Sequence, residues 1–197
     1  RDRIICKYKI PLYMIKDLNK RYEKAKDHLH SYGPRLAGRL DSELDLMGII
    51  QDTKIFKRIT DCMDDYINTS IKYTLVPQGP HHLEILACWM NDMIAGEYNP
   101  VHTHHNGKGW SSVLFLKIPE FINDAKDPHK FQDGGLTFVN VDGVTSNHIE
   151  PRVGDFYLFQ ANHMHCVNPF KTKKPDEIRR SMSFNFIIKD KEKKNVK

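Results

Sequence analysis

Three histidines lie within four positions of the segment 98–105, which contains His102 and His104 two residues apart. In an extended segment, residues i and i+2 point to the same side, so these two imidazoles could bind one metal ion. A third histidine, His165, lies in a later segment. Three protein ligands leave coordination positions open, as a catalytic metal requires if substrate is to reach it. We therefore predict that His102, His104 and His165 are the ligands of a catalytic metal.

The other histidines need a separate interpretation, because the chain has 11 of them. A lone H-x-H pair is more often solvated than metal-bound. His163 lies two residues before His165 and shares its face, so it is a candidate for supporting the ligands or contacting substrate. Five histidines are interpreted as surface or packing residues: His81, His82, His105, His129 and His148.

The segment 179–188 alternates in polarity as a strand does, with Arg179 and Ser181 on one face. A guanidinium binds a carboxylate through two parallel hydrogen bonds, and a hydroxyl can add another. A buried arginine without an anion would be costly. We therefore predict that Arg179 and Ser181 form an anion anchor. The alternative is a surface arginine on an edge strand, with Arg180 as an exposed neighbour.

The elements that must position these residues are mostly short strands. From residue 81 onward, alternating apolar and polar residues are separated by turn residues such as Gly and Pro. Eight short strands at this spacing indicate a sandwich or jelly roll. They begin with the segment 81–90 and continue near 98–104, 111–118, 135–140, 147–150, 154–160, 164–168 and 179–188.

The first 80 residues read differently. Residues 4–15 predict an edge strand or extended arm broken by Pro11. Residues 16–30 predict a short polar helix, and 52–71 predict a clear helix with one apolar face. We interpret 1–80 as a strand and helices that pack on a barrel, 81–188 as the barrel core, and 189–197 as a basic mobile tail.

Bulk composition narrows the class of protein. A chain of 197 residues fits one domain with an extension, and its 40% hydrophobic and 28% charged residues are ordinary for a globular protein. No apolar run is long enough to span a membrane. The net charge of +5 comes largely from the tail, so we do not expect nucleic acid as a partner. The four cysteines are scattered, which favours a reducing cytoplasm.

Six short blocks of the region 81–188 resemble the iron(II)/2-oxoglutarate-dependent oxygenases, in particular a branch found in bacteria and T4-like phages that is described as prolyl-hydroxylase-like. The blocks are 102–104, 111–116, 135–138, 151–155, 165–167 and 179–185. The resemblance implies a double-stranded β-helix (jelly roll), mainly β with flanking helices and an N-terminal helical extension. It also implies iron bound by His102, His104 and His165, and 2-oxoglutarate held by Arg179 and Ser181 near Phe115.

Two residues depart from the pattern of these oxygenases. His104 stands where they usually have Asp or Glu, so the third ligand could instead come from elsewhere, with Glu97 and Asp133 as candidates. Phe115 stands where this branch often has Tyr, which removes a hydroxyl that could help to hold 2-oxoglutarate.

The resemblance implies an iron(II)- and 2-oxoglutarate-dependent dioxygenase that uses O2 to hydroxylate a substrate, with a peptide or protein side chain as the first expectation. A three-His cupin-like metal dioxygenase without 2-oxoglutarate is the second hypothesis. A non-catalytic jelly-roll binding module is the third. The expected location is the cytoplasm, that of the host if the chain is phage-encoded. The identity of the substrate, the oligomeric state and the role of residues 1–80 are not readable from the sequence.

Overall fold

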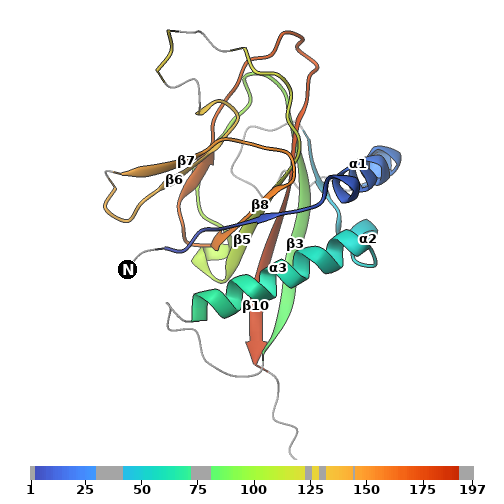
Figure 1. Ribbon diagram of the computed structural model, residues 1–197, viewed down its shortest axis with the longest axis vertical. Helices are drawn as coiled ribbons and strands as arrows, with labels where there is room; N and C mark the ends of the chain where they lie inside the picture. The colour runs from blue at the N-terminus through green and yellow to red at the C-terminus, as the bar shows by residue number, and fades with distance from the viewer. Residues whose placement is uncertain are drawn as a thin grey trace, which may run out of the picture.

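The computed structural model describes residues 3–29, 42–71, 81–122, 126–128, 132–143 and 145–190, without the side chains of 42–44, 71, 81, 105 and 190. Among these residues, antiparallel strands are the largest class of secondary structure (Figure 1). The strands are β1 (Cys6–Lys9), β2 (Ser42–Asp45), β3 (His81–Met93), β4 (Asn99–His102), β5 (Trp110–Lys117), β6 (Leu136–Val139), β7 (Ser146–Ile149), β8 (Asp155–Gln160), β9 (His165–Val167) and β10 (Arg179–Asp190). The helices are α1 (Leu12–Ala25), α2 (Met47–Ile50) and α3 (Lys54–Ile71), with short 3-10 turns η1 (Lys26–His28) and η3 (His105–Gly107).

The strands form two sheets. The larger has the order β1-β8-β5-β10-β3-β2, and the smaller has the order β4-β9-β6-β7. Their inner faces share one apolar cluster, to which the larger sheet contributes Phe115 and Phe159 and the smaller sheet contributes Leu136 and Phe138. This arrangement confirms the predicted mainly β jelly roll.

Strand β10 is central in the larger sheet and separates two environments. Its outward side chains Met182, Phe184 and Phe186 are fully buried in the main core. Helices α1 and α3 supply the other side of that core, and Figure 1 shows α3 crossing β10 and β3. The apolar stripe predicted on residues 52–71 therefore packs against the outside of the barrel, while the inward face of β10 remains polar.

The N-terminal segment folds differently from its sequence prediction at Pro11. We expected this proline to interrupt an extended arm, but it directly precedes α1, and its carbonyl accepts hydrogen bonds from the N–H groups of Met14 and Ile15. Proline is well suited to a helix start, because its φ is fixed near the helical value and its missing N–H has no partner there. The helix predicted over 16–30 therefore begins earlier and ends earlier.

Strands β1 and β2 form the two edges of the larger sheet, paired with β8 and β3. The sequence did not predict β2. The division of the chain at residue 80 and the role of 189–197 as a tail stay predictions; residues 191–197 lie outside the described part of the chain.

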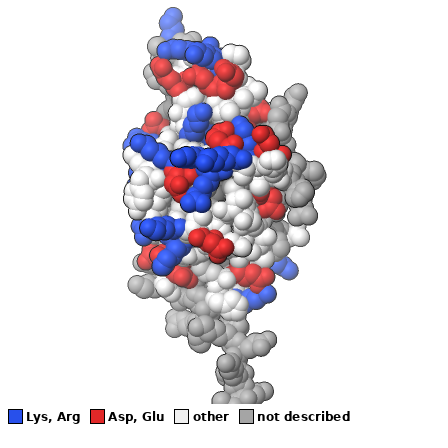
Figure 2. Space-filling view, turned by 90° about the vertical axis from the view of Figure 1, so that its right-hand side faces the viewer, with Lys and Arg blue, Asp and Glu red and all other residues white. Residues whose placement is uncertain are grey.

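The face on the right of Figure 1 carries charges of both signs. Figure 2 shows lysine and arginine side chains interspersed there with aspartate and glutamate. Ion pairs along α1, Arg21 with Asp17 and Lys26 with Glu23, are part of this pattern. None of the described helices combines the length and apolar character that a membrane span requires.

Candidate active site

The three histidines singled out from the sequence lie together. His102 ends β4 and His165 begins β9, and the two are direct partners in the pairing of these strands. His104 follows in the turn before β5, and its backbone N–H donates to the Ala161 carbonyl at 2.9 Å. The nitrogen atoms that these three side chains offer all lie within 4.8 Å of one another. The fold thus assembles a three-histidine group from two separate segments.

Hydrogen bonds orient two of the rings. His102 Nδ1 lies 2.6 Å from the Pro100 carbonyl oxygen, and His165 Nδ1 lies 2.9 Å from that of His163. An Nδ1–H that donates to a carbonyl leaves Nε2 with a lone pair for a metal. His104 Nε2 and His165 Nε2 are 3.1 Å apart. Two nitrogens in adjacent positions of one ion, each roughly 2.1 Å from it, would be separated by roughly 3 Å. The donor set therefore fits a metal ion.

The surroundings keep these imidazoles neutral. Burial, with smaller effects from the neighbouring histidines, lowers the pKa of His104 to about 2. Burial and His102 lower the pKa of His165 to about 3, and burial also lowers that of His102. Aromatic rings pack beside the histidines. The ring centroids of Trp89 and His104 are 5.7 Å apart, and those of Phe159 and His165 are 4.8 Å apart. A neutral imidazole is the form that binds a metal.

The two acidic alternatives for the third ligand do not join this group. Within the described residues, the side chains that have metal-ligand spacing are His102, His104 and His165 alone. The Glu97 carboxylate instead accepts a hydrogen bond from the backbone N–H of Ile94 at 2.7 Å. Asp133 is likewise not part of the group of side chains with metal-ligand spacing.

The predicted anion anchor begins the central strand β10. Arg179 is 0% exposed. Its Nε donates to the Gly134 carbonyl at 2.5 Å, and its Nη1 lies 3.3 Å from Ser181 Oγ. Its Nη2 is buried and has no hydrogen-bond partner in the described part of the chain. Burial lowers the pKa of this guanidinium to about 9.

This environment excludes one of the two sequence interpretations of Arg179. β10 lies between β5 and β3, so the alternative of a surface arginine on an edge strand is wrong. The Cζ atom of Arg179 also lies 5.2 Å from the centroid of the Phe115 ring, and Phe115 is fully buried. A buried cation with an unused donor fits an anionic ligand.

Arg180 corrects a second expectation. The alternative interpretation of Arg179 placed Arg180 at the surface as well, but Arg180 is only 1% exposed. Its side chain lies on the outer face of the sheet and forms ion pairs with Asp92 and Glu23. The alternation of the strand correctly indicated opposite faces, but not that helix α1 covers the outer one.

One pocket is lined by the three histidines and by Ser181, one of the two residues of the predicted anchor. Two amides in this lining, Asn91 and Asn99, have buried Oδ1 atoms without a hydrogen-bond partner among the described residues. Asn99 was not predicted from the sequence. It is buried through the pairing of β4 with β9, where it lies opposite Val167, and no local sequence pattern indicates this pairing. The remaining lining residues are Trp89, Val113, Leu136, Val167 and Ser183.

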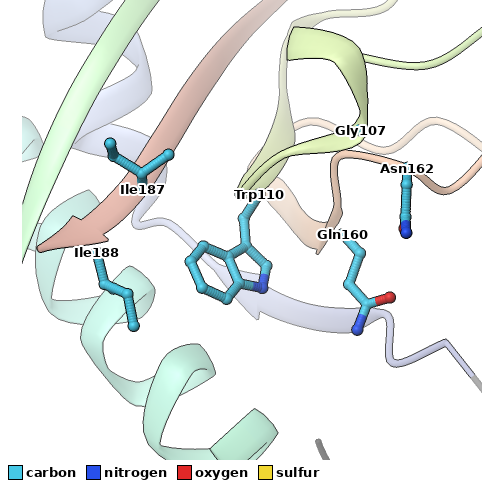
Figure 3. A pocket seen from close by; sticks show the side chains of 7 residues that line it. Gly107, Trp110, Gln160, Asn162, Ile187 and Ile188 are labelled. Carbon is cyan, nitrogen blue, oxygen red and sulfur yellow. The ribbon is translucent and has the colours of Figure 1, made fainter. Parts of the chain in front are cut away.

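A second cavity, of about 440 Å³, lies beside the loop that carries His104 (Figure 3). The figure shows Trp110 between Ile187, Ile188 and Gln160. The loop after His104 is a tight turn, in which the Gly107 N–H donates to the His104 carbonyl at 2.7 Å. A Cβ at Gly109, which has φ +77°, would contact the Phe186 carbonyl oxygen. The cavity wall and His104 thus belong to one tightly packed loop.

Comparison with protein families identifies the fold's chemistry. Residues 87–185, about half of the chain, match the family described as "Putative 2OG-Fe(II) oxygenase". The chain belongs to this family. It is therefore a 2-oxoglutarate- and iron(II)-dependent dioxygenase, and the resemblance inferred from the six sequence blocks is confirmed. A comparison of the oxygenase with curated protein sequences found no match.

Solved structures with the same fold include several prolyl hydroxylases. A prolyl-4-hydroxylase of Pseudomonas putida is 16% identical, with a TM-score of 0.60, 93% of this chain covered and 91% of that one. A prolyl hydroxylase of Trichoplax adhaerens, in complex with a hypoxia inducible factor peptide, is 12% identical with a TM-score of 0.62 and coverage of 93% and 83%. The viral collagen prolyl hydroxylase of Paramecium Bursaria Chlorella virus-1, in a 2-oxoglutarate complex, is 13% identical with a TM-score of 0.60 and coverage of 92% and 94%. At these identities the likeness is one of fold.

Proposed function

We propose that this dioxygenase holds its iron(II) with His102, His104 and His165. We further propose that Arg179 and Ser181 bind the tail carboxylate of 2-oxoglutarate. The observation that carries this proposal is the unpartnered, fully buried Nη2 of Arg179. Its hydrogen-bonded neighbour Ser181 lines the same pocket as the three neutral imidazoles. A dicarboxylate with a 2-oxo acid at one end suits a metal for that end, and Ser181 with its hydrogen-bonded guanidinium Arg179 for the other carboxylate.

The residues of the chain contribute binding, orientation and exclusion of water. Arg179 supplies two donors to a carboxylate, and its remaining contact to Gly134 fixes the plane of the guanidinium. Phe115 covers the guanidinium and keeps water from it. Iron bound here, with 2-oxoglutarate and O2, supplies the oxidation that leaves a hydroxyl on the substrate and forms succinate and carbon dioxide.

The histidine at position 104 changes the charge of the site. Three neutral imidazoles leave the ion with one more unit of positive charge than two imidazoles and a carboxylate would. The anionic cosubstrate is then the main source of negative charge at the metal. We expect the ion and 2-oxoglutarate to strengthen each other's binding through this charge.

The two alternative functions make different predictions. A three-His dioxygenase that does not use 2-oxoglutarate would have no need for an unpaired buried guanidinium beside its metal. A non-catalytic jelly-roll module would not form succinate. Formation of succinate from 2-oxoglutarate by the iron-loaded protein separates our proposal from both.

For the substrate, we propose a side chain of a peptide or protein. The prolyl hydroxylase of Trichoplax adhaerens shares the fold and was crystallised with a peptide. The cavity beside Trp110 is large enough for a flanking side chain and adjoins the His104 loop. We also propose a cytoplasmic location, because the four cysteines form no disulfide.

The test combines metal and cosubstrate binding with variants of the proposed ligands. Under anaerobic conditions, iron(II) and then 2-oxoglutarate are titrated into the wild type, His102→Ala, His165→Ala and Arg179→Ala. We expect the histidine variants to lose iron and Arg179→Ala to lose only 2-oxoglutarate. His82→Ala, at an exposed position of β3, is the matched control. Iron binding that survives both histidine substitutions would overturn the ligand assignment.

A further inference from the structure

Arg180 is the neighbour of the anion anchor in sequence, but its side chain lies on the opposite face of β10. It makes a two-pronged contact with Asp92, the residue opposite it on β3, through Nε at 2.6 Å and Nη2 at 2.7 Å. The same guanidinium also donates to helix α1, to Glu23 Oε1 at 2.6 Å and to Asn19 Oδ1 at 3.2 Å. Its Cζ lies 4.4 Å from the Tyr22 ring centroid. Arg180 therefore joins β10, β3 and α1 at one point.

The charges in this cluster support one another. Burial by itself would lower the pKa of Arg180, but hydrogen bonds and charge interactions with Asp92 and Glu23 raise it above its ordinary value. The pKa of Glu23 is lowered to about 2, by Lys26 first and by Arg180 next. The guanidinium and the carboxylate of Glu23 are thus both ionised at neutral pH.

The neighbouring strand β5 has an irregularity at the same level. Arg180 pairs with Lys117 whereas Ser181 pairs with Phe115, so Leu116 is an extra residue without a partner on β10. An extra residue of this kind leaves ladder groups unpaired. Here the Leu116 carbonyl accepts a hydrogen bond from Asn19 Nδ2 at 3.0 Å. The side-chain amide of Asn19 therefore donates to the β5 bulge through its nitrogen and accepts from Arg180 through its oxygen.

The same two strands carry the proposed 2-oxoglutarate contacts on their other face. Ser181 and Phe115 are direct partners immediately after the bulge, and Arg179 immediately precedes Arg180. Because successive residues of a strand point to opposite faces, a shift in the backbone at Leu116 or Arg180 moves all three of these side chains. The proposed 2-oxoglutarate contacts on the inner face are thus adjacent in the chain to the contacts of Arg180 and Leu116 with α1 on the outer face.

We infer that Asn19 and Glu23 of helix α1 are positioning residues for the 2-oxoglutarate pocket, acting through Arg180 and the Leu116 bulge. The two lie four positions apart on α1 and so share one face of the helix. The inference gives α1 a role in the reaction and rests on the proposed function, in which Arg179 binds the cosubstrate. Neither residue touches the pocket itself.

The experiment measures 2-oxoglutarate affinity and turnover in Asn19→Ala and Glu23→Gln. We expect the Kd and the KM for 2-oxoglutarate to rise roughly five- to thirtyfold in Asn19→Ala and less in Glu23→Gln. The kcat at saturating 2-oxoglutarate and the affinity for iron should change less than threefold. Asp17→Asn is the matched control, because it removes a carboxylate of the same helix that pairs with an exposed arginine, Arg21. All measurements are made well below the unfolding temperature of the least stable variant.

A conservative variant separates positioning from general packing of the helix. Asn19→Asp keeps an acceptor for Arg180 but loses the donor to Leu116, so its 2-oxoglutarate affinity should lie between those of the wild type and Asn19→Ala. If Asn19→Ala does not fold, Asn19→Asp and Glu23→Gln decide the question. Unchanged 2-oxoglutarate affinity in these variants, with only a lower unfolding temperature, would overturn the inference.

Arg179→Ala in the same series separates a failure of the positioning role of α1 from a failure of the proposed 2-oxoglutarate anchor. If Arg179→Ala loses 2-oxoglutarate binding while the α1 variants retain it, the positioning role alone is wrong. If Arg179→Ala also binds 2-oxoglutarate normally, the proposed anchor itself is wrong.

Discussion

The two consecutive arginines of β10 should differ in their response to the same substitution, because among the described residues only Arg180 has a carboxylate counter-ion. Arg180 has Asp92, which is 10% exposed, and Glu23, which is 46% exposed. Removing one partner of a buried ion pair costs roughly 3–5 kcal/mol, whereas a half-exposed pair contributes little. We therefore expect Arg180→Met to destabilise the fold by about 3 kcal/mol or more.

Arg179→Met should have a much smaller effect on the stability of the cosubstrate-free protein. The substitution removes a buried charge that has no carboxylate partner in the part of the chain that the structure describes, and replaces it with an apolar side chain of similar length. Against this gain stands the loss of the guanidinium's hydrogen bonds to Gly134 and Ser181, each worth roughly 1.5–3 kcal/mol because the donor is charged. The net change in the free energy of unfolding should lie within about 1 kcal/mol of zero.

Binding of 2-oxoglutarate should reverse the order of the two variants. Truncating one partner of a buried charge pair costs roughly 2–5 kcal/mol. At 1.4 kcal/mol for each tenfold change, Arg179→Met should weaken the Kd roughly 30-fold to several thousandfold. Arg180→Met should retain more of its affinity, because its effect on the pocket is indirect.

Urea unfolding of the metal-loaded, anaerobic protein, with and without 2-oxoglutarate, measures both quantities in one series. 2-Oxoglutarate should increase the unfolding free energy of the wild type, and this increase should be much smaller in Arg179→Met at the same ligand concentration. The reasoning is refuted if Arg179→Met destabilises the cosubstrate-free protein more than Arg180→Met does. Gly134 and Ser181, rather than a ligand, would then account for the burial of Arg179.

Three further predictions concern other parts of the site. Phe115→Tyr should tighten 2-oxoglutarate binding if the new hydroxyl reaches the carboxylate, and calorimetry would show a lower Kd; a weaker Kd would mean that the hydroxyl is buried without a partner. His104→Asp should still bind iron whereas His104→Ala should bind it much more weakly, and equal metal content in the two would move the third ligand elsewhere. In the metal-free protein, the pKa values of about 2 for His104 and about 3 for His165 lie below the ordinary value near 6.5, so the unfolded chain takes up protons that the folded chain excludes. Stability should then fall as pH drops from about 6 toward 3, by about 1 kcal/mol or more per pH unit, and urea unfolding of His104→Asn should show a shallower dependence.

The sequence alone determined which side chains of a strand share a face. The two-residue spacing of His102 and His104, and of Arg179 and Ser181, follows from the period of the extended chain, which is a local property. The same local alternation and turn chemistry predicted the jelly roll and most of its strands. These features need no knowledge of what lies next to a strand.

The tertiary structure decided which faces are covered and which distant residues meet. Only the pairing of β4 with β9 brings His165 opposite His102. This pairing completes the three-histidine group, of which Glu97 and Asp133 are not part in the described structure. The alternation of β10 does not predict whether Arg180 is buried. Its burial comes from the docking of α1, which contacts its guanidinium. The physical reason is that a residue's face is set by its immediate neighbours in the chain, whereas its burial and partners depend on contacts between segments far apart in sequence.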